Sequence, residues 1–334
     1  MWKMLAAILE SLSSPVGDGD DLFRVQSIPG FDKHFIGRDT LGRPVLLLVA
    51  AEQTPIAATA PLRLRYIRVQ HDVRCRVSSD AGAVTEITCS LLQCLAADSA
   101  LHIYFLQAVA SLVNLMGPAP SRATITTLVR RFAELFYTLT QPPRKPIQGL
   151  WAELFLMAES PGPLTLCNAW RNLPEERFDF ALGPYRIEVK STRSHLRRHR
   201  FSLEQLLPNP NRIILVASVI LEPSNSGPSI ADLLSIIRRR IASHPDILFR
   251  LEEAVALTLG EGIETIGAVR FDREMALDSM RYFDGASVPA IRAPIPEGVS
   301  RIEFDSDLSL APVVDRHSEI FSSDLFKALP HERP

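Results

Sequence analysis

The sequence has few cysteines and none of the cysteine patterns that mark a structural metal site. The four cysteines, Cys75, Cys89, Cys94 and Cys167, form no CxxC pair and lie near no histidine at zinc-finger spacing. This excludes the zinc-finger class of nucleic-acid-binding proteins. Reduced and mostly buried thiols are the simpler expectation, and they fit a cytoplasmic protein.

The chain also lacks an excess of charge of either sign. It has 36 Lys and Arg against 38 Asp and Glu, which gives a formal net charge of −2. A chain that is cationic throughout is therefore excluded, and any nucleic-acid surface must be a local basic patch. The sequence contains no internal repeat and no low-complexity tract.

Long hydrophobic runs are missing as well. The most apolar stretch, 101–116, is interrupted by polar side chains, and no run reaches the length of a transmembrane helix. The N-terminal stretch MWKMLAAILESLSS carries Glu10 and has no small-residue cleavage site, so it predicts a short amphipathic helix and not a signal peptide. We expect no membrane-spanning segment and a cytoplasmic location.

What is present is enough apolar sequence for two domains. The chain has 334 residues, of which 46% are hydrophobic, as in ordinary globular proteins. Strand-like alternation over 23–88 gives way to helical periodicity, with helices expected at 100–116 and 121–138. The proline-rich segment 141–146 breaks any helix. We therefore predict an N-terminal domain over 1–141, built of strands and then two helices, and a second domain over 147–334.

The second domain has a clear order of elements. The pattern predicts a helix at 147–157 and then three strands, 164–170, 177–182 and 185–191. A short helix at 202–207 and a β-branched strand at 212–221 complete the series, and helical and extended additions follow. The order αβββαβ indicates an α/β (α+β mixed) fold, a mixed central sheet with helices on its faces.

Three charged residues stand on the central hairpin of this domain. Glu188 and Lys190 share one face of their strand because alternate side chains do, and Asp179 can lie beside Glu188 across the Gly183-Pro184 turn. Two adjacent carboxylates repel each other unless a cation is supplied, and Mg²⁺ is the oxygen-seeking cation that would do so. Lys190 could then contact a phosphate or orient a water molecule. The alternative is an exposed hairpin with a solvated ladder of charges.

These acids and the lysine resemble the PD-(D/E)XK motif of many restriction and repair endonucleases, although Phe178 stands where the name places proline. The predicted αβββαβ order is similar to the restriction-endonuclease-like core of that superfamily. Glu153 matches the acid often found on the first core helix. The longer pattern resembles a bacterial family named for this motif and found in restriction-modification-like defence islands. The matching pieces are GLWAEL at 149–154, FDF at 178–180, EVKST at 188–192 and HRFSLEQL at 199–206.

The resemblance implies a metal-dependent endonuclease that hydrolyses DNA in bacterial anti-phage defence or restriction. It implies catalytic roles for Lys190, Glu188, Asp179 and Glu153, with the three acids binding Mg²⁺ or, in its place, Mn²⁺. Its implied partners are DNA and either a second copy of the chain or other defence-system subunits. The alternative is a catalytically inactive nuclease-fold subunit that binds DNA or assembles a complex. The sequence leaves open whether DNA or RNA is the substrate.

A basic segment, 193–200, follows the motif directly. Because phosphate binding is mainly electrostatic, its place beside Lys190 predicts contact with nucleic acid. The candidate DNA-binding residues are Arg193, Arg197, Arg198, His199, Arg200 and Gln205. We expect His199 to be a structural hydrogen-bonding group and not a catalytic base, and Gln205 to make at most a backbone contact. The alternative for the segment is a solvated loop.

Overall fold

The computed structural model describes residues 1–16, 22–52, 60–78, 84–143, 146–171, 176–292 and 294–331. The chain divides into two units: unit 1 comprises 1–144 and 244–264, and unit 2 comprises 145–243 and 265–334. The predicted second domain, 147–334, differs from unit 2 in one segment, because 244–264 belongs to unit 1. Arg144 and Lys145, in the predicted linker, lie outside the described residues.

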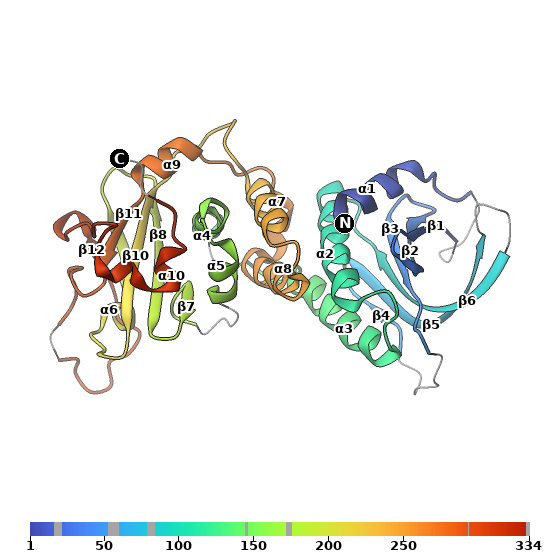
Figure 1. The fold of residues 1–334 in the computed structure, drawn as a ribbon, viewed down its shortest axis with the longest axis horizontal. Helices are drawn as coiled ribbons and strands as arrows, with labels where there is room; N and C mark the ends of the chain where they lie inside the picture. Colours follow the sequence, from blue (N-terminus) through green and yellow to red (C-terminus); the bar gives the residue numbers. More distant parts are fainter. Residues whose placement is uncertain are drawn as a thin grey trace. The chain divides into compact units, whose positions relative to one another are not determined.

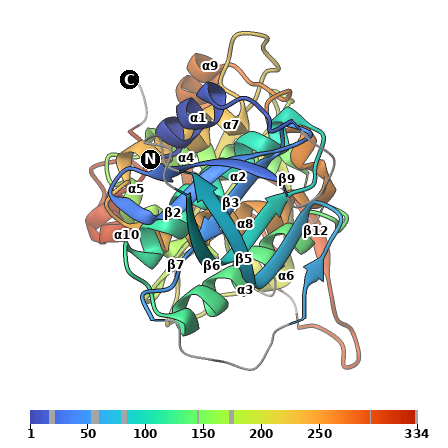
Figure 2. The same ribbon diagram turned by 90° about the vertical axis from the view of Figure 1, so that its right-hand side faces the viewer.

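Unit 1 is a six-stranded antiparallel sheet with helices. The strands run in the order β1-β2-β3-β6-β5-β4, and Figure 2 looks onto this sheet. Their bounds are β1 (Phe23–Ile28), β2 (Phe31–Asp39), β3 (Pro44–Leu48), β4 (Leu62–Arg63), β5 (Ile67–Ser78) and β6 (Val84–Cys94). The helices are α1 (Trp2–Ser11), α2 (Ser99–Met116), α3 (Arg122–Thr138) and α8 (Pro245–Leu259). In Figure 1, α2 and α3 lie along the sheet. The predicted helices of this half are confirmed.

Helix α2 is the core helix of unit 1. Among the described residues it is the one helix long and apolar enough to cross a membrane, yet 67% of its apolar window is buried inside the fold. Asp98 caps its first turn by accepting from Ala100 N at 2.6 Å. The Phe105 ring packs against Phe132 and Phe136 of α3, with centroids 5.5 and 5.8 Å apart. The burial therefore accounts for the apolar run at 101–116.

Unit 2 is built on a four-stranded mixed sheet in the order β11-β10-β8-β7. Strand β8 is antiparallel to β7 and parallel to β10, and β10 is antiparallel to β11. A second, two-stranded sheet pairs β9 with β12. The strands are β7 (Phe180–Leu182), β8 (Tyr185–Thr192), β9 (Arg198–Ser202), β10 (Ile213–Ile220), β11 (Arg281–Asp284) and β12 (Glu303–Asp307). The predicted α/β (α+β mixed) fold class with a mixed sheet is confirmed.

The helices of unit 2 surround this sheet. They are α4 (Ile147–Glu159), α5 (Pro163–Ala169), α6 (Leu203–Leu206), α7 (Ile230–Arg240), α9 (Arg273–Ser279) and α10 (Asp324–Lys327). Short 3₁₀ helices occur in unit 2 at η2 (Leu308–Leu310) and η3 (Glu319–Ser322), and η1 (Gly260–Thr265) lies at the end of the unit 1 segment 244–264. In Figure 1, α4 and α5 lie together on one side of the sheet.

One predicted strand is wrong. Residues 164–170 form helix α5 and its C-cap, because Pro163 occupies the first helical position, where its fixed φ and missing N–H cost nothing. The order of elements nevertheless still reads αβββαβ once the two helices are taken together. The third strand is β9, whose residues 198–200 belong to the basic segment 193–200.

Helix α4 is held in place by tryptophan. Trp151 is fully buried, stacks on Phe155 with ring centroids 4.7 Å apart, and donates from Nε1 to Pro228 O at 2.8 Å. Gln148 at the start of the helix donates to Ser191 Oγ of β8 at 3.2 Å. These contacts fix the rotation of α4 over β8 and turn Glu153 into the interior, where it is 2% exposed.

Candidate functional site

The site is organised by a tight hairpin between β7 and β8. Gly183 has φ 55, which the first central residue of a two-residue type II′ hairpin requires, and Pro184 follows it. The last registered pair is Phe180 with Ile187. Asp179 therefore stands one step beyond the ladder, next to the backbone of Glu188 and Val189.

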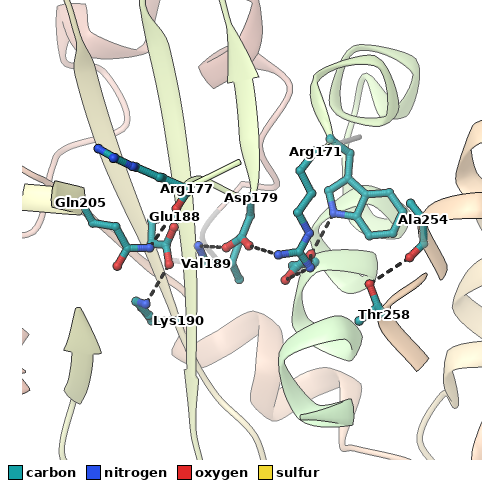
Figure 3. A network of polar contacts seen from close by, with 11 residues as sticks. Arg171, Arg177, Asp179, Glu188, Val189, Lys190, Gln205, Ala254 and Thr258 are labelled. Carbon is teal, nitrogen blue, oxygen red and sulfur yellow. Dashed lines mark hydrogen bonds and ion pairs between the residues drawn. The ribbon is translucent and has the colours of Figure 1, made fainter. Parts of the chain in front are cut away.

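Asp179 completes the ladder with its side chain. Its Oδ2 accepts from Val189 N at 2.8 Å, in place of the next backbone carbonyl, and its own carbonyl accepts from Arg171 N at 3.0 Å. The residue is 2% exposed. The contact with Val189 N is drawn close to the centre of Figure 3, where Asp179 lies between β8 and the Arg171 guanidinium. The carboxylate is thus fixed by the backbone of two segments.

Arg171 joins Asp179 to Glu153. Its Nη1 lies 3.3 Å from Asp179 Oδ1, and its Nη2 lies 3.1 Å from Glu153 Oε2 and 3.2 Å from Oε1. Trp170 Nε1 donates to Glu153 Oε2 at 2.8 Å. Two buried carboxylates from α4 and the start of β7 therefore share one guanidinium, which offsets the cost of removing them from water.

Glu188 and Lys190 form a second charged group. Glu188 Oε1 lies 2.7 Å from Lys190 Nζ, and the ammonium stands 4.7 Å from the centroid of the Phe201 ring. Glu188 is 5% exposed, while Lys190 is half-buried. In Figure 3 this pair lies on one side of β8 and Asp179 with Arg171 on the other.

The predicted acids are thus brought into two groups and not into one. In the described ranges, no three or more His, Cys, Asp or Glu side chains are arranged to hold a metal ion. The chemistry of the donor set still fits a hard divalent cation, which prefers oxygen ligands. Asp179 presents a carboxylate at the Val189 N–H, and Glu188 presents one from the residue before Val189. Arg171 and Lys190 supply the positive charge here.

Sequence reasoning missed Arg171 and Trp170. Both follow α5, in a stretch where a strand is predicted, and no spacing rule links an arginine at this position to an acid 18 residues earlier.

The basic segment divides into buried and exposed parts. Arg197 points inward, where Nη1 donates to Ser218 O at 2.9 Å and to Ser218 Oγ at 2.8 Å, and Nη2 donates to Ser279 O. It therefore ties β9 to β10 and the end of α9. Arg193 is exposed in the loop before β9.

Arg198 and Arg200 face an acidic strand. The register pairs Asp307 with Arg198 and Asp305 with Arg200, at N–O distances of 3.4 Å in each case. Glu303 adds a contact to Arg200 at 3.9 Å. The two arginines are 68% and 70% exposed, so these ion pairs are worth little and either guanidinium can exchange its partner.

His199 is buried between these arginines. Its Nε2 lies 2.9 Å from Ser218 Oγ, and the side chain faces the interior. Burial is the main cause that lowers its pKa to about 4, and the charges of Lys190 and Arg197 lower the pKa further. A neutral imidazole bonded to a serine fits the structural role expected from the sequence.

Gln205 makes backbone contacts. Its Oε1 accepts from Ser202 N at 3.0 Å in a capping box at the start of α6, and its Nε2 donates to Arg177 O at 3.0 Å. The side chain therefore fixes α6 against the segment that leads into Asp179. Its predicted contact with DNA stays a prediction.

A family model described as "Putative PD-(D/E)XK family member, (DUF4420)" matches residues 5–309. The match covers nearly the whole chain, so it takes in strands of unit 1 as well as the hairpin and the segment after it. The resemblance predicted from the sequence is confirmed by it. Neither a curated protein nor a solved structure matches the chain.

Replacing Arg171 by Gln should destabilise unit 2, because two buried carboxylates lose their shared cation. Removing one partner of a buried ion pair costs about 3–5 kcal/mol. Urea unfolding followed by tryptophan fluorescence in a Trp2→Phe background reports on Trp151 and Trp170, the remaining tryptophans. Glu153→Gln added to Arg171→Gln should recover part of the loss. Wild-type stability for Arg171→Gln, or no recovery in the pair, would contradict the shared ion pair.

The lowered pKa of His199 predicts a loss of stability in acid. The unfolded chain binds a proton near the ordinary value of 6.5, whereas the folded protein does so only near pH 4. The contribution of His199 is therefore complete above about pH 6.5 and is lost as the pH falls toward about 4. His199→Gln should lose less stability over this window, by roughly 2–3 kcal/mol, as urea midpoints would show. His195→Gln, in the exposed loop, should behave like wild type.

Proposed function

The chain belongs to the PD-(D/E)XK family DUF4420, whose model matches residues 5–309, and we propose that it is a metal-dependent endonuclease. The proposed reaction is hydrolysis of the phosphodiester bonds of DNA. The observation that carries the proposal is the placing of Glu188 and Lys190 on β8, with Asp179 fixed to the Val189 N–H between them. Burying these charged groups costs desolvation free energy, so their presence in the fold supports a functional role.

The proposed metal ligands are Asp179, Glu188 and Glu153, of which Glu153 and Asp179 share Arg171. Mg²⁺ is the expected ion and Mn²⁺ the expected substitute, because both take carboxylate oxygens. When bound, such an ion would stabilise charge on the phosphate and lower the pKa of an attacking water.

The chain's own side chains would orient the substrate. Lys190 Nζ is fixed between Glu188 Oε1 and the face of the Phe201 ring, so a phosphate oxygen could take the open side of this ammonium as a charge-assisted acceptor. Arg171 holds Glu153 through two oxygens and Asp179 through one. With a metal ion bound by Asp179, Arg171 would still hold Glu153.

The wider setting is proposed from the resemblance of the sequence to a family found in defence islands. A restriction or anti-phage role, a cytoplasmic location and assembly with a second copy or other defence subunits are all part of the proposal. The exposed arginines Arg193, Arg198 and Arg200 support a polyanionic partner near the hairpin, since phosphate binding depends on local positive charge.

A second candidate is a subunit with the nuclease fold and no activity of its own, which binds DNA or assembles a complex. One observation favours it: Glu153, Asp179 and Glu188 each form an ion pair with an arginine or lysine of the chain itself. Calorimetry with Mn²⁺ separates the two candidates. Binding to wild type that is lost in Asp179→Ala supports the nuclease, whereas no heat from either wild type or Arg171→Gln supports the inactive subunit.

Lys190→Ala should abolish DNA cleavage, by at least a hundredfold, because a positioned charge at the reacting phosphate is lost. The assay is cleavage of plasmid and linear DNA with Mg²⁺ or Mn²⁺ at fixed salt. Lys327→Ala, which removes an exposed lysine from α10, is the matched control and should cleave like wild type. Unchanged cleavage by Lys190→Ala would overturn the assignment.

The acidic strand β12 should restrain DNA binding. Replacing Asp305 and Asp307 by Asn frees two exposed guanidinium groups for phosphate, so affinity for duplex DNA should rise several-fold at low salt and less at high salt. Fluorescence anisotropy with labelled DNA measures this. Glu297→Gln with Glu319→Gln changes the net charge equally at other exposed positions of unit 2. An equal gain in this control would show a general charge effect and no role for β12.

A further inference from the structure

Unit 2 contains a cavity of about 500 Å³ at the end of the sheet where β10 begins and β11 ends. It is lined by the α6–β10 connection at 206–210, by 212–214, by 284–286 and by Arg292. The volume falls in the range of roughly 300–1,000 Å³ that is typical of small-ligand sites. None of the residues assigned above to metal or phosphodiester chemistry lines it.

Positive charge gathers at this cavity without an equal number of acids. Arg212 lies in its wall with the guanidinium carbon 5.7 Å from the centroid of the Phe178 ring. Within the described residues its buried Nε has no hydrogen-bond partner. The neighbouring Arg186 has its pKa lowered, first by burial and then by the charge of Arg212, while the charge of Glu176 acts in the opposite direction. An anion bound in the cavity at the Arg212 guanidinium would therefore relieve this repulsion.

Arg292 makes the cavity rigid. It donates from Nη1 to Leu206 O at 3.2 Å and from Nη2 to Ala286 O at 3.0 Å, so it connects two opposite walls. Asp284, the acid of the lining, accepts from Ala286 N at 2.9 Å through Oδ1. A preformed cavity loses little entropy when it takes a ligand.

Gly285 lines the cavity where the turn after β11 approaches β10. Gly285 N donates to Ile214 O at 2.9 Å, and a Cβ on this residue would lie 2.9 Å from Ile214 Cβ. A side chain here would push the two strands apart. The close approach of β10 and the turn after β11 thus gives the cavity an apolar base.

We propose that this cavity binds one nucleotide unit, with the phosphate on Arg212 and the base against the apolar wall. The two arginines of the lining, Arg212 and Arg292, favour an anion. The apolar wall favours a ligand that also carries a flat, weakly polar group; it is formed by Leu206, Leu207, Pro208 and Ile213. A nucleoside monophosphate combines the two. Base faces stack well on guanidinium planes and apolar side chains.

The unit can come from a DNA strand or from a free nucleotide. Phe178, which contacts Arg212, directly precedes Asp179, and Arg186 lies two residues before Glu188 on the same strand. A strand occupying the cavity would therefore pass beside the proposed catalytic residues, and in that form the inference rests on the proposed function. Binding of a nucleotide at the cavity does not itself require cleavage.

The test is calorimetry on the full chain in EDTA, which removes metal-dependent binding and cleavage. The probes are deoxynucleoside 5′-monophosphates, the matching nucleosides, inorganic phosphate and a short single-stranded oligonucleotide. We expect the monophosphates to bind at least tenfold more tightly than nucleoside or phosphate alone. Arg212→Gln should weaken this binding at least tenfold, and Arg239→Gln, an exposed arginine of α7, should not.

Ala286→Trp is the second variant, because it fills the cavity from its exposed rim and keeps Arg212. It should block the monophosphates equally. An oligonucleotide that binds more tightly than a monophosphate and loses affinity in both variants identifies a strand site, and equal affinities identify a free-nucleotide site. If monophosphates do not bind, or if both variants bind every probe like wild type, the inference is overturned. Cleavage that depends on Lys190 would then still stand, and nucleotide binding in a chain without cleavage would leave the cavity assignment intact.

Discussion

The burial of three carboxylates around one strand is the constraint on which unit 2 depends. Moving an ion out of water costs several kcal/mol even after relaxation, so each acid must meet a cation and directed donors. Glu153 and Asp179 share Arg171, and Asp179 also accepts from the Val189 N–H. Glu188 has Lys190. Every neighbouring element must then be placed so that these contacts are made.

The packing of α4 and of the segment before β7 positions the charged residues. Trp151 sets the rotation of α4, so Glu153 reaches the interior at the level of Arg171. The bridge between Trp170 and Phe180 continues the sheet by one residue and brings Arg171 beside Asp179. Two tryptophans thus position Glu153. The indole N–H of Trp151 fixes helix α4, and the indole N–H of Trp170 fixes the carboxylate of Glu153 itself.

Local patterns in the sequence predicted the hairpin well and the ion pairs poorly. The Gly183-Pro184 turn and the period-two alternation of β8 act within a few residues, so the neighbours of Asp179 could be inferred. Helix α5 was mistaken for a strand because a short apolar run carries no clear period. The acidic partners of Arg198 and Arg200 come from more than 100 residues away, as Asp307 does for Arg198. The helical additions expected after 221 include α8, but no local pattern shows that α8 packs in unit 1.

The cations of this region differ in how readily they can change partner, and this decides which of them a phosphate can use. Arg197 is tied by charge-assisted bonds to Ser218 and Ser279 in the interior, where breaking a contact leaves a buried group unsatisfied. Arg198 and Arg200 hold acids in water, where such pairs are worth about 0–1 kcal/mol. A phosphate would displace the acids of β12 from those two arginines long before it displaced the serines from Arg197. Of the basic segment, the outward positions of β9 are therefore the ones suited to DNA, and the inward ones hold β9 to the sheet.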